Sequence, residues 1–299
     1  MTLLSYQVFH EVARLGSFRE AAEVLHLTPS AVSHAVSAME KELGFSLFTR
    51  SRSGVVLTNY GEHLLPYINA VLVSDESFHQ AVADLNGLQS GEVRVGCFSS
   101  ICTNWMADII RSFGERYPHI NIELYQGTYD DVSAWIRNGV VDFGFLSVSS
   151  AEGLPIEPLC RDPLLCVVPK NFKKKLDVPY MTPDEMKDEV FVSQMESTDA
   201  DIANFMRENG LTVRSNYHVV DDLSTIAMVE AGFGICIMPE LVMNDIPYAV
   251  DTYPTKPAAS RIIGISALHP HSLTPAAKTL YRHVVECYRE EMEPAAVGG

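Results

Sequence analysis

Apolar residues recur at helical spacing in consecutive segments at the start of the chain. The first stripe runs from Leu4 to Leu15, and Gly16 ends it. The second stripe covers residues 18–25 and follows Ser17, a residue type that caps helix N-termini. These two patterns predict short amphipathic helices joined by a tight turn.

The next segment, HLTPSAVSHAVSAMEKELG, predicts a third helix with two unlike faces. Thr28 suits the N-cap, and Pro29 suits the first helical position, where no backbone donor is needed. One face is apolar and anchors the helix, whereas the other consists of short polar side chains. The members of that polar face are Ser30, Ser33, His34 and Ser37. Such side chains let a helix approach base edges in the major groove and bond to them.

Two short strands, 47–50 and 55–57, follow and are joined by a turn. Three helices and a hairpin are the outline of a winged helix-turn-helix, which we assign to residues 1–58. Arginines on the hairpin suit contacts with the DNA backbone or the minor groove. The candidate DNA contacts are Thr28, Pro29, Ser30, Ser33, His34, Ser37, Arg50 and Arg52. A helical domain that packs on another protein is the alternative, but the Thr-Pro turn and the arginines favour DNA.

A long helix is predicted within residues 59–88, a linker segment. Its apolar residues are close to a coiled-coil register if Asp75 is counted as one of the seam positions. The candidate dimerisation residues are Leu64, Ile68, Val71, Phe78, Val82 and Leu85. Packing of this helix on its own chain is the alternative. We favour dimerisation, because the helix lies between two domains and has no obvious core of its own to cover. A dimer places two reading helices on successive major-groove faces, so the expected target is an inverted repeat.

From Val93 onward strands alternate with helices, and residues 89–299 predict an α/β domain with parallel sheets and two similar halves. Ligands in such folds bind beyond the carboxyl ends of the strands, between the halves. The candidate effector residues are Ser99, Ser100, Gly127, Thr128, Ser147, Ser193, Ser197, Thr198 and Asp221. Hydroxyls at helix N-termini favour a small anion or carboxylate, although plain N-capping would explain any one of them.

Charge separates the two parts of the chain. The net charge is −16, yet residues 1–58 hold five basic and five acidic side chains, so the whole excess lies beyond them. An acidic body repels nucleic acid, whereas a neutral head with two neighbouring arginines can approach a phosphate backbone. The sequence has no membrane-length apolar run, and its first residues lack the layout of a secretion signal. We therefore expect a cytoplasmic protein with no membrane partner.

The chemistry expected of the chain is binding rather than catalysis. We find no nucleophile elbow, P-loop, dinucleotide fingerprint or zinc signature, so we predict neither an enzyme nor a metal or cofactor. The histidines of the HPH run at 269–271 lack a third ligand. Six cysteines occur without a C-x-x-C pair and read as buried, reduced side chains. A redox sensor is the alternative function, with Cys102 as its best candidate.

The head region resembles a known family. FREAAEVLHLTPSAVSHAVSAMEKELGFSLFTRSRSGVVLTNYGEHLLPY is similar to the DNA-binding half of LysR-type transcriptional regulators. It carries A-A-x-x-L, S-A-V-S, E-x-E-L-G, L-F-x-R and L-T-x-x-G as one uninterrupted block. The resemblance covers about residues 1–90 strongly, and beyond them it rests on architecture. One departure is His34, where arginine is frequent in the family, which weakens an expected phosphate or guanine contact.

The resemblance implies an architecture and a set of partners. The body is expected to be periplasmic-binding-protein-like (type II), with subdomain I at about 91–161 and 265–299 and subdomain II at about 162–264. The implied partners are double-stranded DNA, a small-molecule effector, further copies of the chain in a homodimer or homotetramer and, for an activator, RNA polymerase. The implied function is a ligand-responsive transcription regulator.

Overall fold

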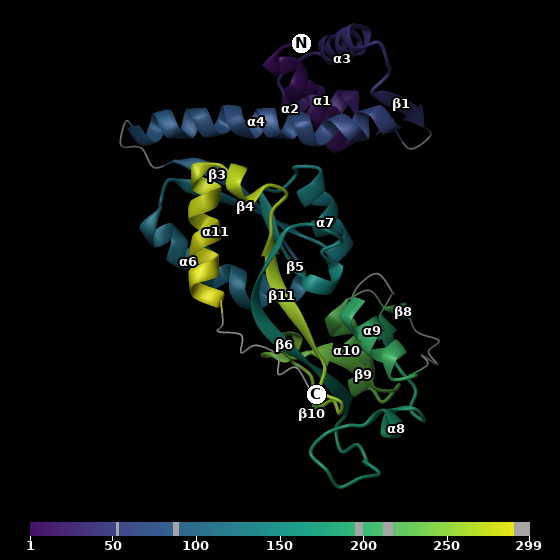
Figure 1. Cartoon of the computed structure of the whole chain (residues 1–299). Helices are drawn as coiled ribbons and strands as arrows, with labels where there is room; N and C mark the ends of the chain where they lie inside the picture. Colours follow the sequence, from purple (N-terminus) through teal and green to yellow (C-terminus); the bar gives the residue numbers. More distant parts are fainter. Residues whose placement is uncertain (52–53, 86–89, 195–199, 212–217, 220, 290–299) are drawn as a thin grey trace, which may run out of the picture.

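The computed structural model describes residues 1–51, 54–85, 90–194, 200–211, 218–219 and 221–289 (Figure 1). The head contains α1 (Leu3–Leu15), α2 (Phe18–Val24) and α3 (Pro29–Leu43), followed by the hairpin of β1 (Phe48–Ser51) and β2 (Gly54–Leu57). The three helices and the hairpin predicted from the sequence are confirmed. No helix among the described residues is long and apolar enough to span a bilayer.

The helices of the head begin and end where the sequence places their caps. Ser17 and Thr28 accept hydrogen bonds from backbone N–H groups in the first turns of α2 and α3. Gly16 and Gly44 adopt left-handed conformations at the ends of α1 and α3. The apolar stripes then meet in one core, made of Val8, Val12, Ala21, Ala22, Val32 and Val36.

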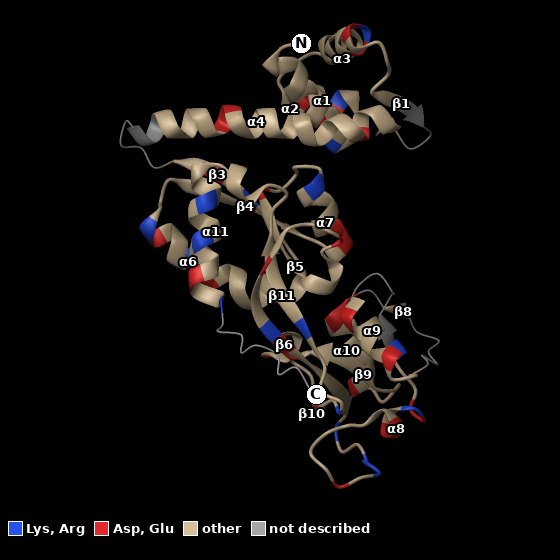
Figure 2. Cartoon of the chain, viewed as in Figure 1, with Lys and Arg blue, Asp and Glu red and all other residues tan. Residues whose placement is uncertain are grey.

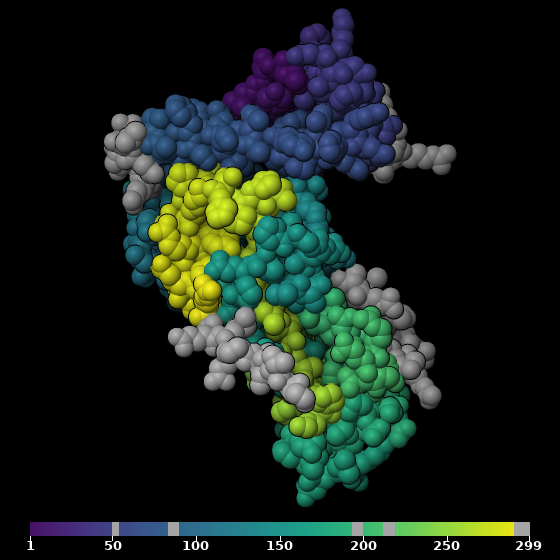
Figure 3. All heavy atoms as spheres, viewed as in Figure 1, coloured from purple at the N-terminus to yellow at the C-terminus, as the bar shows by residue number. Residues whose placement is uncertain are grey.

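Helix α4 (Asn59–Leu85) lies between the head and the body (Figures 1 and 3). Thr58 holds its start, because its hydroxyl donates to the carbonyl of Ser46 (2.8 Å) and accepts from the Gly61 N–H (3.2 Å). A Cβ at Gly61 would overlap the carbonyl oxygen of Leu47, so only glycine lets α4 pack this tightly against the hairpin. This packing explains the L-T-x-x-G pattern in physical terms.

The body is built on one sheet that both halves share. Its strands are β3 (Gly91–Cys97), β4 (Ile120–Gln126), β5 (Phe143–Ser147), β6 (Ile156–Pro169), β9 (Cys236–Pro239), β10 (Val250–Pro254) and β11 (Ser260–Ser266). Among the described residues the order is β10-β6-β11-β5-β3-β4, with β9 also paired to β6. A separate pair, β7 (Ser193–Gln194) with β8 (His218–Val219), lies in the second half.

Helices cover the two halves separately (Figure 1). Around β3–β5 these are α5 (Ser99–Ile101), the π-helical η1 (Cys102–Met106), α6 (Ala107–Arg116), α7 (Tyr129–Arg137) and α11 (Pro275–Tyr288). The second half carries α8 (Pro183–Met186), α9 (Ala200–Glu208) and α10 (Asp222–Glu230). Short 3₁₀ turns are η2 (Val148–Ser150), η3 (Glu240–Met243) and η4 (Pro270–Ser272).

The expectation of parallel sheets is wrong for the centre of the body. Strands β3, β4 and β5 are parallel, but β11 runs antiparallel to β5 and β6, and β6 runs antiparallel to β9 and β10. The reason is that β6 and β11 carry the chain out of the first half and back again. The first part of β6 pairs with β11, and its second part, from Leu164, pairs with β9 and β10. The boundary expected near residue 161 therefore falls inside a continuous strand.

Candidate functional site

Helix α3 presents its polar face to solvent. The six candidate DNA contacts on or next to this helix are all exposed, namely Thr28, Pro29, Ser30, Ser33, His34 and Ser37. On the opposite side Val32, Val36 and Met39 are buried in the head. Charged side chains appear only at the last turns of the helix, and the rest of α3 is uncharged (Figure 2). The structure therefore brings the six residues together on one accessible surface.

The hairpin is fixed beside α3 by a carboxylate. Oε1 of Glu40 accepts hydrogen bonds from the backbone N–H groups of Leu47 (2.6 Å) and Phe48 (3.2 Å). Arg50 belongs to β1, but its side chain, like all of Arg52, lies outside the described residues. The DNA contacts expected of these two arginines stay a prediction.

Helix α4 divides the proposed dimerisation residues between two faces. Ile68 is only 5% exposed and lies in a core with Phe9, Met39, Leu47 and Leu65, so it is not available to a partner. Leu64 packs partly against the same core, whereas Val71, Phe78 and Val82 are exposed. The side chain of Leu85 lies outside the described residues.

Two exposed tyrosines favour a different register for a dimer contact along α4. Tyr60 and Tyr67 are 59% and 63% exposed and lie on the face that carries Val71 and Phe78. The alternating four- and three-residue spacing that fits this face is Tyr60, Leu64, Tyr67, Val71, Ser74, Phe78, Ala81 and Leu85. Compared with the register predicted from the sequence, Tyr67 thus replaces Ile68, Ser74 replaces Asp75, and Ala81 replaces the exposed Val82. We call these eight residues the seam.

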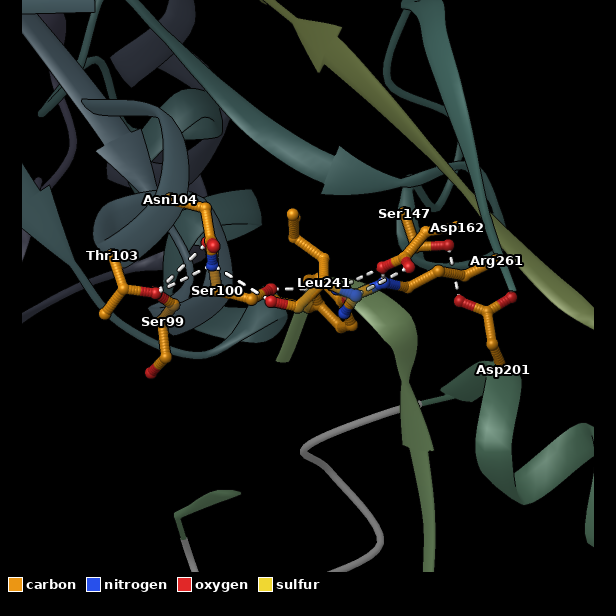
Figure 4. Close-up of polar contacts among 10 residues, drawn as sticks. Ser99, Ser100, Thr103, Asn104, Ser147, Asp162, Asp201, Leu241 and Arg261 are labelled. Carbon is orange, nitrogen blue, oxygen red and sulfur yellow. Dashed lines mark hydrogen bonds and ion pairs between the residues drawn. The ribbon is translucent and has the colours of Figure 1, made fainter. Parts of the chain in front are cut away.

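A cavity of about 220 Å³ lies between the two halves of the body, beyond the carboxyl ends of β3 and β4. Five of the nine candidate effector residues line it, namely Ser99, Ser100, Gly127, Thr128 and Asp221. The side chain of Ser193 and all of Ser197 and Thr198 lie outside the described residues. Ser147 is fully buried and does not line the cavity; its hydroxyl donates to Asp201 of α9 at 2.5 Å (Figure 4). We call this cavity the cleft.

One residue that lines the cleft, Arg261, was missed by the sequence analysis (Figure 4). It is 3% exposed and forms an ion pair with Asp162, at 2.7 Å between Nη2 and Oδ2. Its Nη1 donates to the hydroxyl of Tyr129, and its Nη2 donates to Oγ of Ser100, both at 2.8 Å. The guanidinium also stacks on Phe98, 5.0 Å from the ring centroid.

This ion pair joins both halves of the body. Arg261 and Asp162 are direct partners in the β11–β6 pairing, on the strands that connect the halves. Arg261 reaches the first half through Ser100 and Tyr129, while Oδ1 of Asp162 accepts the N–H of Leu241 in the second half (2.9 Å). A further bond runs from Nδ2 of Asn104 to the carbonyl of Leu241 (3.0 Å) (Figure 4). These bonds therefore join the two walls of the cleft.

Carboxylates dominate the charge of the cleft lining. The helix that begins at Ser99 points its first turn at the cleft, and among the described residues its N-cap position, Phe98, makes no side-chain cap hydrogen bond. Elsewhere the lining contains Asp131, Asp221 and Asp222, while the charge of Arg261 is balanced by Asp162. Hydrogen bonds from Ser224 hold the pKa of Asp221 below its ordinary value, so Asp221 is ionised at neutral pH.

The cysteines do not form an obvious reactive site. Burial raises the pKa of Cys97 and Cys236 and raises that of Cys166 to about 12, so these thiols stay protonated. Cys102 is half-buried at the start of the π-helical turn next to the cleft. The redox alternative rests on Cys102 and stays a prediction.

Comparisons with known proteins identify the family of both parts of the chain. Residues 3–62 match the model for the bacterial regulatory helix-turn-helix proteins of the lysR family, and residues 86–288 match the LysR substrate binding domain. The chain is 30% identical to an uncharacterized HTH-type transcriptional regulator, YvbU of Bacillus subtilis (strain 168), over 83% of this chain and 84% of that protein. It is 28% identical to the probable HTH-type transcriptional regulator LrrA of Synechococcus elongatus, over 90% and 91% of the two chains.

Solved structures show the same fold. A full-length OxyR variant from Pseudomonas aeruginosa has a TM-score of 0.75 at 19% identity and covers 98% of this chain and 99% of its own. Full-length CbnR complexed with its target DNA has a TM-score of 0.54 at 21% identity, with 96% and 99% covered. The chain belongs to the LysR family of transcriptional regulators, which combine a helix-turn-helix head with an effector-binding domain.

Proposed function

We propose that this regulator binds an inverted-repeat DNA target through α3, as a homodimer formed along the seam, and that a small molecule in the cleft controls the binding. The observation that carries the DNA part is the exposed polar face of α3, whose short side chains oppose a fully buried apolar face. Bound DNA is also recorded for CbnR, a protein of the same fold. The function needs no catalysis, takes place in the cytoplasm and, for an activator, includes RNA polymerase.

Replacing Ser33 by alanine is expected to weaken binding to the selected DNA target about fivefold for each helix. The reason is the loss of one hydrogen bond at the interface, worth about 1 kcal/mol. Duplexes are first selected from genomic DNA by the unchanged protein, and dissociation constants are then measured by fluorescence anisotropy. Ser46→Ala is the control, because Ser46 is an exposed serine of the head that is not among the candidate DNA contacts. Equal affinities for the Ser33 and Ser46 variants would contradict the assignment of α3.

The cleft supports a small carboxylate that also carries an amine or hydroxyl group. Its carboxylate would lie at the uncapped helix start near Ser100, as the sequence analysis expects of an anion. An ammonium group would face Asp221 and Asp222. A ligand is recorded in a domain of this fold, the effector binding domain of QuiR in complex with shikimate. That structure has a TM-score of 0.59 at 18% identity and covers 67% of this chain and 97% of its own.

Thermal unfolding with a ligand panel tests this proposal. The panel contains amino acids, simple carboxylates and simple amines, each with and without reductant. A ligand at 100 times its dissociation constant stabilises the protein by about 2.7 kcal/mol, which raises the melting temperature. We expect amino acids or hydroxy acids to give the shift. We also expect Asp221→Asn, which keeps the helix cap, to reduce it for amino acids only. A shift on oxidation alone would favour the redox alternative.

A further inference from the structure

Two buried side chains, His10 and Asn69, and the backbone carbonyl of Asn138 connect the head, α4 and the body. Nδ2 of Asn69 on α4 donates to the backbone carbonyl of Asn138, at the end of α7, at 2.8 Å. Oδ1 of Asn69 lies 2.8 Å from Nδ1 of His10 on α1. Since the amide nitrogen of Asn69 is bonded to a carbonyl, its oxygen faces the imidazole and accepts from it. His10 and Asn69 are 8% and 6% exposed, so both bonds are largely shielded from solvent.

The backbone around Asn138 is shaped for this contact. Gly139 has a φ of +66°, and a Cβ there would lie 2.8 Å from Cγ of Asn69 and closer still to its Nδ2. Any other residue would push Asn69 away from the carbonyl or force the backbone to change. Burial also lowers the pKa of His10, which keeps the imidazole neutral and able to serve as the single donor at Nδ1.

Helix α7 extends from this contact to the cleft. It has nine residues and spans about 13 Å. At its start, Thr128 lines the cleft and the Tyr129 hydroxyl accepts from Arg261. Val132 and Ile136 on its inner face are buried in the body core, so the helix is packed firmly on the first half. Its last turn leads into Asn138, the residue that bonds Asn69.

We propose that Asn69 is the residue that positions the DNA-binding head on the body, and that α7 transmits changes in the cleft to it. The route runs from Arg261 to Tyr129, along α7 to the carbonyl of Asn138, and through Asn69 to His10 on α1. It rests on the proposed control of binding by a ligand in the cleft. A shift of Tyr129 changes the position of the Asn138 carbonyl, and the Asn69 side chain then moves α1 with it.

A second polar contact of α4 provides a matched control. Gln80 lies about three turns further along the helix, and its Oε1 accepts the N–H of Ala276 at 3.0 Å. Gln80 is also buried, but it bonds α11 and Glu76 rather than the head. Gln80→Ala therefore removes a buried bond between α4 and the body without touching α1.

Hydrogen–deuterium exchange of the full chain, without DNA, tests the route. Tyr129→Phe removes the hydroxyl held by Arg261 and serves as the change in the cleft. We expect it to raise exchange at least threefold in the part of α1 that contains His10. The same change should have less than a 1.5-fold effect when Asn69→Ala is also present. It should keep its full effect in the presence of Gln80→Ala.

Two results would overturn the inference. One is that Tyr129→Phe raises exchange in α1 equally in the chain with Asn69 and in the Asn69→Ala variant. The other is no effect of Tyr129→Phe on α1 in the otherwise unchanged chain. If Asn69→Ala does not fold, His10→Phe replaces it, because this change removes the donor and keeps the ring volume.

The DNA function is tested apart from this coupling. Exchange that follows the expected pattern in a protein that binds no duplex would retain the route and contradict the proposed DNA function. If the protein binds a duplex, the dissociation constant of that duplex is measured for the same set of variants. Tyr129→Phe should then change the affinity for the duplex at least threefold in the otherwise unchanged chain. In the Asn69→Ala background it should change that affinity less than 1.5-fold.

Discussion

Replacing Arg261 by methionine is expected to lower the free energy of unfolding of the body by about 3–5 kcal/mol. The substitution leaves the carboxylate of Asp162 buried without its cation, and an uncompensated buried charge is far more costly than the pair is favourable. It also removes the donors that Ser100 and Tyr129 accept from. Urea unfolding followed by circular dichroism measures the change.

Arg161→Met is the matched control for this prediction. Arg161 precedes Asp162 on β6, but it is exposed, and in the described structure its side chain bonds only the hydroxyl of Ser260. Its substitution should change stability by less than about 0.5 kcal/mol. Combining Arg261→Met with Asp162→Leu should recover most of the loss, because a buried pair replaced by apolar groups costs little. Equal losses for Arg161→Met and Arg261→Met would contradict the role given to the pair.

The sequence predicts the head well because its structure is local. Each of its caps lies within a few residues of the backbone groups that it satisfies, and each apolar stripe has the period of a helix. The same period separates the exposed face of α3 from Val32 and Val36. The exposed face of α3 can therefore be predicted from the sequence of the helix alone.

The cleft is predicted only in part because its centre is not local. Ser100 and Thr128 follow strands, and the rule for strand ends finds them. Arg261 reaches Ser100 across 161 positions of sequence, and no pattern links the two. A charged residue at the start of the apolar run RIIGIS is the one local signal, since a charge in a buried strand needs a partner.

The difference between the predicted register of α4 and its exposed face has a similar cause. Ile68 and Tyr67 are neighbours, and both are apolar enough to fit a seam. The choice between them depends on which side of α4 meets the head, and that is decided by the core around Phe9 and Leu65. Tyr67, an aromatic residue with a polar hydroxyl, is then left on the exposed side, and tyrosine is common at interfaces.

Replacing Phe78 by glutamate is expected to raise the dissociation constant of the dimer at least 100-fold. Phe78 is 64% exposed in the single chain and has no core of its own to fill. Burying it in a seam contributes about 1.5–3 kcal/mol from each copy, and a buried carboxylate adds a desolvation cost. A loss of about 2.7 kcal/mol corresponds to the 100-fold change. Sedimentation equilibrium over a range of concentrations measures it.

His79→Glu separates the seam from a general effect of added charge. His79 adjoins Phe78 and is also exposed, but it lies outside the seam positions. The His79 variant should remain a dimer and bind the inverted repeat. The Phe78 variant should bind the full repeat no better than a half-site, because a single head contacts only one half. Unchanged sedimentation of the Phe78 variant would exclude this face of α4 as the dimer contact. If the variant instead became a monomer and still preferred the full repeat, DNA itself would bring the two heads together.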